Sequence, residues 1–209
     1  MTKTIRVILA EDDEFLQQLL QMQCEVLGAE VTSVSNGEEA VSLALTYEYD
    51  VLLMDIQMPV CDGIQAMTLL RQLGYERPIY AMSADTITAD GFTGVLTKPL
   101  QDADLQQLLQ QQHPKTPVAL VIAPELLQQF LQSLPLLQQD FVHCCQQQNW
   151  AELQRLSHKL AGSAGSFGYP AISEQAKQLQ LALLQQEPEA VIAERLAHLQ
   201  QRLQEVMHG

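Results

Sequence analysis

Hydrophobic residues in the first half of the chain form short continuous runs that alternate with amphipathic segments. Runs of strand length occupy Ile5–Ala10, Ala29–Ser33, Asp50–Met54, Pro78–Met82 and Gly94–Thr97. The segments between and after them that have helical spacing are 14–27, 36–47, 61–73 and 102–112. Short apolar strands that alternate with amphipathic helices are typical of a parallel sheet covered on both faces. The pattern predicts an α/β doubly wound sheet of five parallel strands.

The second half has only helical periodicity, from Pro124 to Val206. The periodicity is interrupted at Ser133–Pro135, Asn149, Gly165–Pro170 and Glu187–Pro188. Short connections between amphipathic helices imply an antiparallel all-α bundle. The proline-containing stretch HPKTPVALVIAP separates the two patterns. We therefore expect a first domain at residues 1–113, a linker at 114–123 and a second domain at 124–209.

Charge is unevenly distributed over a chain whose net charge is -14. Residues 1–113 contain 5 Lys/Arg and 17 Asp/Glu, a net charge of −12, and the remainder contains 6 and 8, a net charge of −2. Nucleic-acid binding needs clustered basic residues, so we expect no nucleic-acid partner. The N-terminus resembles a strand and no signal peptide, and no apolar run is long enough to cross a bilayer. We expect a cytoplasmic protein with no membrane insertion.

The four cysteines are Cys24, Cys61, Cys144 and Cys145. None forms a C-x-x-C pair, and their spacing matches no common metal site. We expect buried or half-buried thiols in a reducing compartment.

Polar residues follow the carboxyl ends of four predicted strands, the edge at which open parallel α/β sheets bind ligands. They are Glu11, Asp12 and Asp13 after the first strand, Asp55 after the third, Ser83 after the fourth and Lys98 after the fifth. Carboxylates that lie together are costly unless a cation neutralises them. Hard oxygen ligands with open positions suit Mg²⁺, which a phosphate often completes. We therefore expect a Mg²⁺ site at this edge.

A carboxylate beside such a cation can act as a nucleophile toward a phosphoryl group, because the metal screens their mutual repulsion. We expect Asp55 to be the nucleophile, with Lys98 and the Ser83 hydroxyl holding phosphate oxygens. The alternative is that acids after a strand are helix N-terminal charges. That interpretation is favoured for Asp13 and Glu14. It is disfavoured for Asp12 and Asp55 together with Lys98, because the residues at four strand ends agree.

These residues lie in stretches that resemble response-regulator receivers, namely VILAEDD, LLMDIQMPVCDG, PIYAMSA and LTKP. The resemblance covers about residues 3–113. It implies that Asp55 is the phosphoacceptor. It also implies that Asp12 and the Gln57 backbone carbonyl ligate Mg²⁺, with Glu11 helping through water.

The same resemblance implies that Ser83 is the hydroxyl switch residue, that Lys98 binds phosphate, and that the Lys98–Pro99 bond is cis. Two features depart from the family. The ten residues ADTITADGFT precede the fifth strand, so we expect the family's fourth helix to be missing or reduced to a turn. The position that is often aromatic, three before the lysine, holds Val95. Both departures fall on the face through which receivers commonly dimerise or signal.

A predicted helix over Trp150–Phe167 carries a histidine away from its apolar stripe. Leu153, Leu156, Leu160, Ala164 and Phe167 form the stripe. His158 lies roughly 160° from its middle, so we expect an exposed imidazole. A lone exposed histidine usually has no function. Gly162 and Gly165 lie on the same side, however, and would let another backbone approach a nucleophilic imidazole closely. The alternative for Gly165 is a helix end.

The stretch NWAELQRLSHKLAGSAGSFGYPAISEQAKQLQ resembles histidine phosphotransfer domains. The resemblance spans about residues 124–207 and implies a four-helix bundle in which His158 is phosphorylated on a ring nitrogen. Many members carry a lysine three residues after the histidine, where this chain has Ala161. Lys159, one residue after the histidine, would supply nearby positive charge.

Three functions are compatible with these patterns. The favoured one is a phosphoryl carrier without a kinase catalytic domain, with Asp55 and His158 as its two sites. It would exchange phosphoryl groups with a sensor or hybrid histidine kinase and with other receiver or histidine phosphotransfer proteins. In the second, the receiver is a docking module that phosphorylation does not affect. The third, a Mg²⁺-dependent phosphatase, needs an acid at position 57, which holds Gln57.

Overall fold

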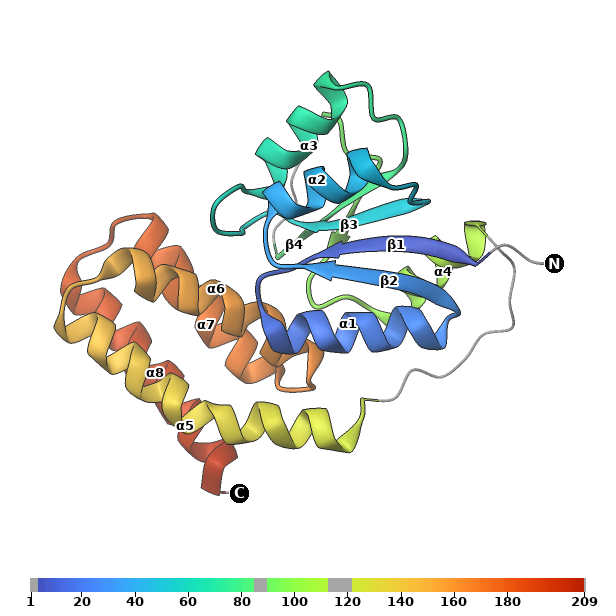
Figure 1. The fold of residues 1–209 in the computed structure, drawn as a ribbon. Helices are drawn as coiled ribbons and strands as arrows, with labels where there is room; N and C mark the ends of the chain where they lie inside the picture. Colours follow the sequence, from blue (N-terminus) through green and yellow to red (C-terminus); the bar gives the residue numbers. More distant parts are fainter. Residues whose placement is uncertain (1–3, 85–89, 113–121, 209) are drawn as a thin grey trace. The chain divides into compact units, whose positions relative to one another are not determined.

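The computed structural model describes residues 4–84, 90–112 and 122–208 (Figure 1). The chain divides into two compact units, Met1–Val121 and Ile122–Gly209. The division falls inside the predicted linker, most of which lies outside the described residues, so the exact domain boundaries stay predictions. In the part of the chain that the structure describes, no helix combines the length and apolar character needed to cross a membrane.

The first unit contains the predicted sheet of five parallel strands. The strands are β1 (Ile5–Ala10), β2 (Ala29–Val34), β3 (Val51–Asp55), β4 (Ile79–Ser83) and β5 (Gly94–Thr97). Their order is β2-β1-β3-β4-β5, and every pairing is parallel. From β1 the chain first adds β2 on one side and then β3, β4 and β5 on the other. Doubly wound sheets bind ligands at such a switch point, here between β1 and β3.

Four helices cover the two faces of this sheet, and each face has its own apolar core. They are α1 (Glu14–Val26), α2 (Gly37–Thr46), α3 (Gly63–Gln72) and α4 (Asp102–Gln112). Val7, Leu9 and Leu53 pack with buried residues of α1 and α4, whereas Ile8 and Leu52 pack with those of α2 and α3. The two cores explain why β1, β3 and β4 are continuous apolar runs, because residues on both sides of the pleat are buried in these strands. The edge strands β2 and β5 are partly exposed.

The β4–β5 connection is the segment where the family's fourth helix was expected to be missing. Ala84 and residues 90–93 form no helix, and residues 85–89 lie outside the described residues. The half-buried Phe92 packs against the core that α2 and α3 cover. The Arg71 guanidinium of α3 also donates a hydrogen bond of 2.8 Å to the Gly91 carbonyl. The end of this connection is therefore held against α3.

The second unit is a bundle of four helices, α5 (Pro124–Gln146), α6 (Trp150–Ser166), α7 (Pro170–Leu184) and α8 (Glu189–His208). All five residues of the predicted α6 stripe are buried. Phe130 of α5 stacks on Phe167 with ring centroids 4.5 Å apart. These contacts join α5 to α6 through aromatic packing, which contributes beyond simple area burial.

The expectation of a helix break at Ser133–Pro135 was wrong. The helix that begins at Pro124 continues through Pro135, because Leu134 and Phe141 are fully buried on either side of it. That packing offsets the roughly 3 kcal/mol that an interior proline costs. Gly165, for which a helix end was the alternative interpretation, is in the last turn of α6, which ends at Ser166. The left-handed position after the helix is Gly168, with φ 87°.

Candidate functional site

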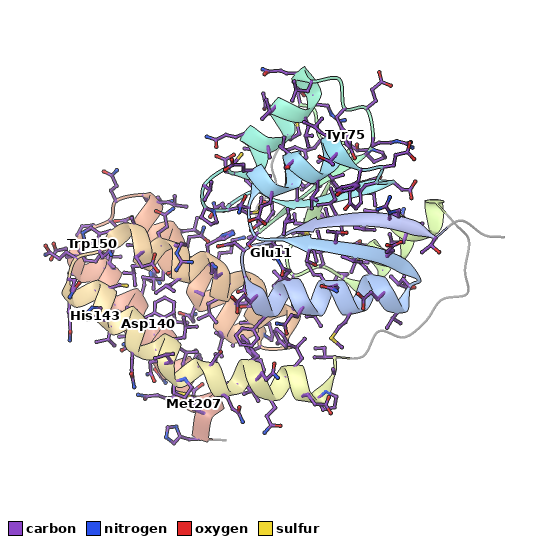
Figure 2. The ribbon with its side chains drawn as sticks, viewed as in Figure 1. Glu11, Tyr75, Asp140, His143, Trp150 and Met207 are labelled. Atoms are coloured by element: carbon purple, nitrogen blue, oxygen red, sulfur yellow. The ribbon has the colours of Figure 1, made fainter. Side chains whose placement is uncertain are left out.

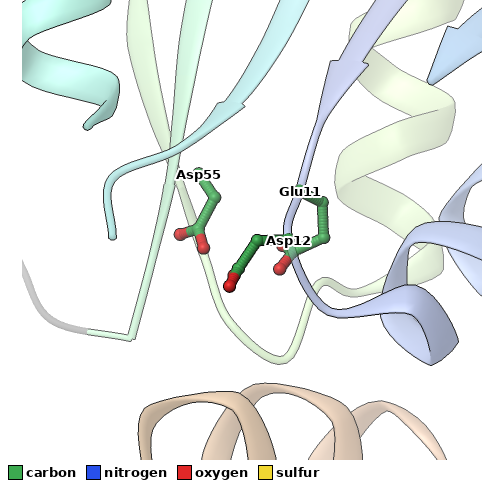
Figure 3. Close-up of side chains that lie close together, drawn as sticks. All are labelled: Glu11, Asp12 and Asp55. Carbon is green, nitrogen blue, oxygen red and sulfur yellow. The ribbon is translucent and has the colours of Figure 1, made fainter. Parts of the chain in front are cut away.

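Three carboxylates converge at the carboxyl edge of the sheet (Figure 3). Glu11 and Asp12 follow β1, and Asp55 is the last residue of β3. Ala10 and Met54 are paired in the parallel ladder, which places the acids that follow them side by side. One oxygen from each of the three carboxylates lies within 4.8 Å of the others. Figure 2 shows Glu11 at the end of β1. The strand register thus assembles the cluster that the sequence predicted.

Lys98 joins this cluster from the end of β5. Its Nζ lies 2.7 Å from Glu11 Oε2 and 3.0 Å from Asp55 Oδ1. The Lys98 backbone N–H donates to the Ser83 carbonyl at 2.7 Å, and the bond to Pro99 is cis, as the family resemblance implied. The ammonium therefore lies between two acids that come from different strands.

Burial and mutual attraction shift the ionisation of these groups. Burial, with a further contribution from Asp55, raises the pKa of the Glu11 carboxyl to about 8, against the opposing effect of Lys98. Burial alone would lower the pKa of Lys98, but Asp55 and Glu11 outweigh it and raise that pKa above its ordinary value. The ammonium therefore stays charged. One cation is shared by several acids, which leaves the pocket short of positive charge.

The donor atoms of this cluster are of the kind that bind a hard divalent cation. All three candidate ligands are carboxylates, which Mg²⁺ prefers over nitrogen and sulfur. Asp55 is 0% exposed and Asp12 9%, so their charges are held out of bulk water, where an uncompensated carboxylate is costly. Asp12, Asp55 and Glu11 can therefore hold such an ion, together with waters and a phosphoryl oxygen.

Local interactions at the ends of β1 and β3 hold these carboxylates in place. Asp13 caps α1 by accepting hydrogen bonds from the backbone N–H groups of Phe15 and Leu16, as its favoured interpretation predicted. The Asp13 N–H in turn donates to Glu11 Oε1 at 3.2 Å. At β3, the Gly63 N–H donates to the Ile56 carbonyl at 3.0 Å, which anchors the start of α3 beside Asp55.

The remaining predicted receiver residues lie near this edge. Ser83 is the last residue of β4, is buried, and pairs in the sheet with Thr97 directly before Lys98. Gln57 lies two residues after Asp55 in the β3–α3 connection and is exposed. Its role as a carbonyl ligand stays a prediction. Val95, at the position that is often aromatic in the family, is 38% exposed on β5.

His158 is in the middle of α6, but the expectation that it is exposed was wrong. Its exposed fraction is 7%. Its Nδ1 lies 3.2 Å from the side-chain nitrogen of Gln180, which is on α7. The helical-wheel argument failed because it allowed α6 only one packed face. Buried residues from 156 to 164 in fact occur around most of the helix, and Gly162 is among them.

Gln180 is a site residue that the sequence analysis missed. It is 4% exposed, and it lies beside Leu179 in the buried part of α7. A glutamine among buried apolar residues is a detectable signal, because buried polar groups are normally hydrogen-bonded. Its partner could not be identified from the sequence, since the partner lies on another helix, 22 positions away.

Comparisons with known families and proteins divide the chain in the same way. Residues 7–110 match the model of the response regulator receiver domain, and residues 125–209 match that of the Hpt domain. Neither match is a kinase catalytic domain.

Three relatives each match about half of the chain. The two-component response regulator ORR41 of Oryza sativa subsp. japonica is 36% identical over 51% of this chain and 93% of its own length. Transcription factor SKN7 of Saccharomyces cerevisiae is 35% identical over 52% of this chain and 19% of its own length. Sensor histidine kinase GacS of Pseudomonas protegens is 33% identical over 50% of this chain and 13% of its own length. The chain thus spans a fifth or less of the length of SKN7 and of GacS.

The two family matches agree with the two structural units, and the acid cluster and His158 lie in different matches. The chain therefore belongs to the two-component phosphorelay proteins, as a response regulator receiver domain fused to an Hpt domain.

Proposed function

We propose that this chain is a phosphoryl carrier in which Asp55 accepts a phosphoryl group and His158 transfers one. The observation that carries the proposal is the contact of Lys98 with both Asp55 and Glu11 at the sheet edge. In this arrangement the buried Asp55 carboxylate can attack phosphorus. The ammonium of Lys98 can neutralise the negative phosphoryl oxygens.

In the receiver, the Asp55 carboxylate forms the bond to phosphorus while the donor's bond to phosphorus breaks. Lys98 is already within 3.0 Å of Asp55 and would move its hydrogen bonds to phosphoryl oxygens. The Ser83 hydroxyl, from the neighbouring strand end, would hold another of these oxygens. A bound Mg²⁺ would supply charge neutralisation between the carboxylates and the phosphoryl group. Asp12, Asp55 and the Gln57 carbonyl would hold this ion, with Glu11 acting through water.

In the Hpt domain, the nucleophile is a ring nitrogen of His158. The Gln180 side chain lies 3.2 Å from Nδ1 and so occupies that ring nitrogen, and the bond with phosphorus would form at Nε2. The Nδ1 proton would be held by the Gln180 side-chain oxygen after rotation of the amide, whose nitrogen and oxygen are assigned by context. In that rotated orientation the Gln180 side chain would favour the tautomer that leaves a lone pair on Nε2.

The partners follow from the two domains. The phosphoryl group comes from a sensor or hybrid histidine kinase and passes to or from other receiver or Hpt proteins. The cytoplasmic location expected from the sequence stays a prediction. The docking-module alternative is not favoured, because the acids and the lysine that phosphorylation needs are all present and lie together. For the phosphatase alternative, no acid occupies position 57.

A transfer experiment with two complementary variants tests the proposal. The His158→Ala chain is loaded at Asp55 with a small acyl phosphate and Mg²⁺, then freed of donor and mixed with the Asp55→Ala chain. We expect an acid-labile phosphoryl adduct to appear on the Asp55→Ala chain as the donor chain loses its own. An acceptor that gains no adduct while the donor chain stays phosphorylated would contradict the transfer step. An acceptor that carries both substitutions is the matched control.

A further inference from the structure

The first observation concerns the charge that a phosphorylated His158 needs nearby. A phosphoryl group brings between one and two negative charges to a half-enclosed site, where cationic donors stabilise it. Position 161, three residues after the histidine, is Ala161 and supplies no such donor. Ala161 is 5% exposed, and its carbonyl accepts a hydrogen bond from Ser173 Oγ on α7. The small side chain allows α7 to approach α6 closely at this point.

The second observation is the position of Lys177 on α7. Ser173, Lys177 and Gln180 are separated by four and three residues, so they lie on one face of that helix. Ser173 contacts α6 at Ala161, and Gln180 contacts α6 at His158. Lys177 is therefore bracketed along the helix by two residues that both contact α6, one of which contacts the histidine itself. Its side chain is half-buried, as expected for a residue at the edge of a helix–helix interface.

Lys159 is the other lysine near the site, but it belongs to a different electrostatic environment. It follows His158 directly on α6, so it projects about 100° away around the helix. The pKa of Glu152 is lowered, chiefly by a hydrogen bond from the Arg155 side chain, and the charge of Lys159 contributes to that lowering. Lys159 therefore also interacts with an acid on its own helix, whereas Lys177 lies on the face of α7 that contacts Ala161 and His158.

We propose that Lys177, from α7, binds the oxygens of the phosphoryl group on His158 and replaces the lysine that many Hpt domains carry three residues after the histidine. The inference rests on the proposed function of His158. A lysine has a flexible four-carbon stem with three donors at its end, so one on a neighbouring helix can serve the same oxygens. The small residues Ala161 and Gly162 leave the strip of α6 beside the histidine free of long side chains.

Nε2 of His158 forms a bond to phosphorus as the donor's bond to phosphorus breaks, and the leaving group keeps the electron pair. With an aspartyl phosphate the leaving group is the carboxylate, and with phosphoramidate it is ammonia. The Nδ1 proton stays on the ring beside Gln180. The Lys177 ammonium donates hydrogen bonds to the phosphoryl oxygens throughout and gives up no proton.

Phosphoramidate tests the inference, because this small donor can load a histidine without a receiver. The parent is the full chain with Asp55→Ala, so that an adduct reports on His158. The variants in this background are Lys177→Gln, Lys177→Arg and Lys159→Gln, and His158→Ala confirms the site of the adduct. The readout is the initial rate of adduct formation by intact mass, with urea midpoints to confirm folding.

We expect Lys177→Gln to lower the initial rate about tenfold, since a hydrogen bond to a charged group is worth at least that factor. Lys177→Arg keeps the charge and restores most of the rate, which a merely structural role would not require. Lys159→Gln should lower the rate less than Lys177→Gln does. The inference would be overturned if Lys177→Gln reacted as fast as the parent, or if Lys159→Gln lost more of its rate than Lys177→Gln. It would also be overturned if the parent gained no adduct. If phosphorylated Asp55 failed to transfer its phosphoryl group to His158 while Lys177→Gln still slowed the reaction with phosphoramidate, the proposed function would be overturned and this inference would stand.

Discussion

Lys98 Nζ lies 3.0 Å from Asp55 Oδ1, and both side chains are almost fully buried. The contact joins the residue that follows β5 to the last residue of β3, across the strand that separates them. The ammonium is also shared with Glu11 of the first strand end. One lysine therefore balances acids from two strand ends in the unphosphorylated receiver.

Replacement of Lys98 with alanine should destabilise the receiver by about 3 kcal/mol, because it leaves buried carboxylates without their cation. Urea denaturation of the Lys98→Ala chain measures the change. Adding Asp55→Asn to this variant should recover part of the loss, since it removes one of the uncompensated charges. Equal midpoints for the wild type and Lys98→Ala would show that the buried pair contributes nothing to folding.

Gly63 is the position where α3 begins against the end of β3. A Cβ at this residue would overlap the Asp55 carbonyl oxygen, which is backbone and cannot rotate away. We expect Gly63→Ala to cost about 3 kcal/mol and to reduce phosphoryl uptake by displacing Asp55. Gly94→Ala is the matched control, because its Cβ would meet only the edge of the Tyr80 ring, at 3.0 Å. A Gly63→Ala protein with wild-type stability and uptake would refute this argument.

Cys24 is fully buried, and burial raises the pKa of its thiol to about 12. The folded chain therefore favours the neutral thiol more than the unfolded chain does. The stabilisation this provides is complete below the unfolded thiol pKa, near 8.5, and is lost as pH rises through about 12.

Two measurements follow from the Cys24 environment. The urea midpoint should fall between pH 8.5 and pH 11 by more in the wild type than in Cys24→Ala. At pH 8, iodoacetamide should label the half-buried Cys61 and Cys145 of the native chain well before Cys24. Rapid labelling of Cys24 under native conditions would be incompatible with its burial.

Gln180 holds Nδ1 of His158 and should select the ring tautomer. The Gln180→Ala chain should accept phosphoryl groups at His158 about tenfold more slowly, because the reactive nitrogen is no longer fixed. Nitrogen NMR shifts of the His158 ring should report a changed tautomer ratio in this variant. Gln178→Ala is the control, since Gln178 donates to Glu174 on the exposed surface. An unchanged tautomer ratio in Gln180→Ala would contradict the assigned role.

The receiver fold could be predicted because the central strands β1, β3 and β4 are short apolar runs that are buried on both faces. The strand-end rule then located Asp12, Asp55 and Lys98 without any coordinates. The sequence could not show that Lys98 bridges Asp55 and Glu11, because that contact depends on side chains that meet across strands.

The Hpt half was harder to predict in its details. The proline rule placed a helix break at Pro135, but burial of Leu134 and Phe141 outweighs that local preference. A single-helix wheel placed His158 in solvent, because the wheel contains no neighbouring helices. Long-range packing decided both outcomes, and it also determined the contact between His158 and Gln180.

Mg²⁺-dependent phosphorylation of Asp55 tests the central claim most directly. The full chain and its Asp55→Ala variant are incubated with a small acyl phosphate, with Mg²⁺ or with excess chelator, and their intact masses are recorded. The account predicts one base-labile phosphoryl adduct on the wild type that requires Mg²⁺ and is absent from Asp55→Ala. A wild-type chain that gains no adduct with Mg²⁺ present, or an adduct that persists in Asp55→Ala and resists base, would contradict it.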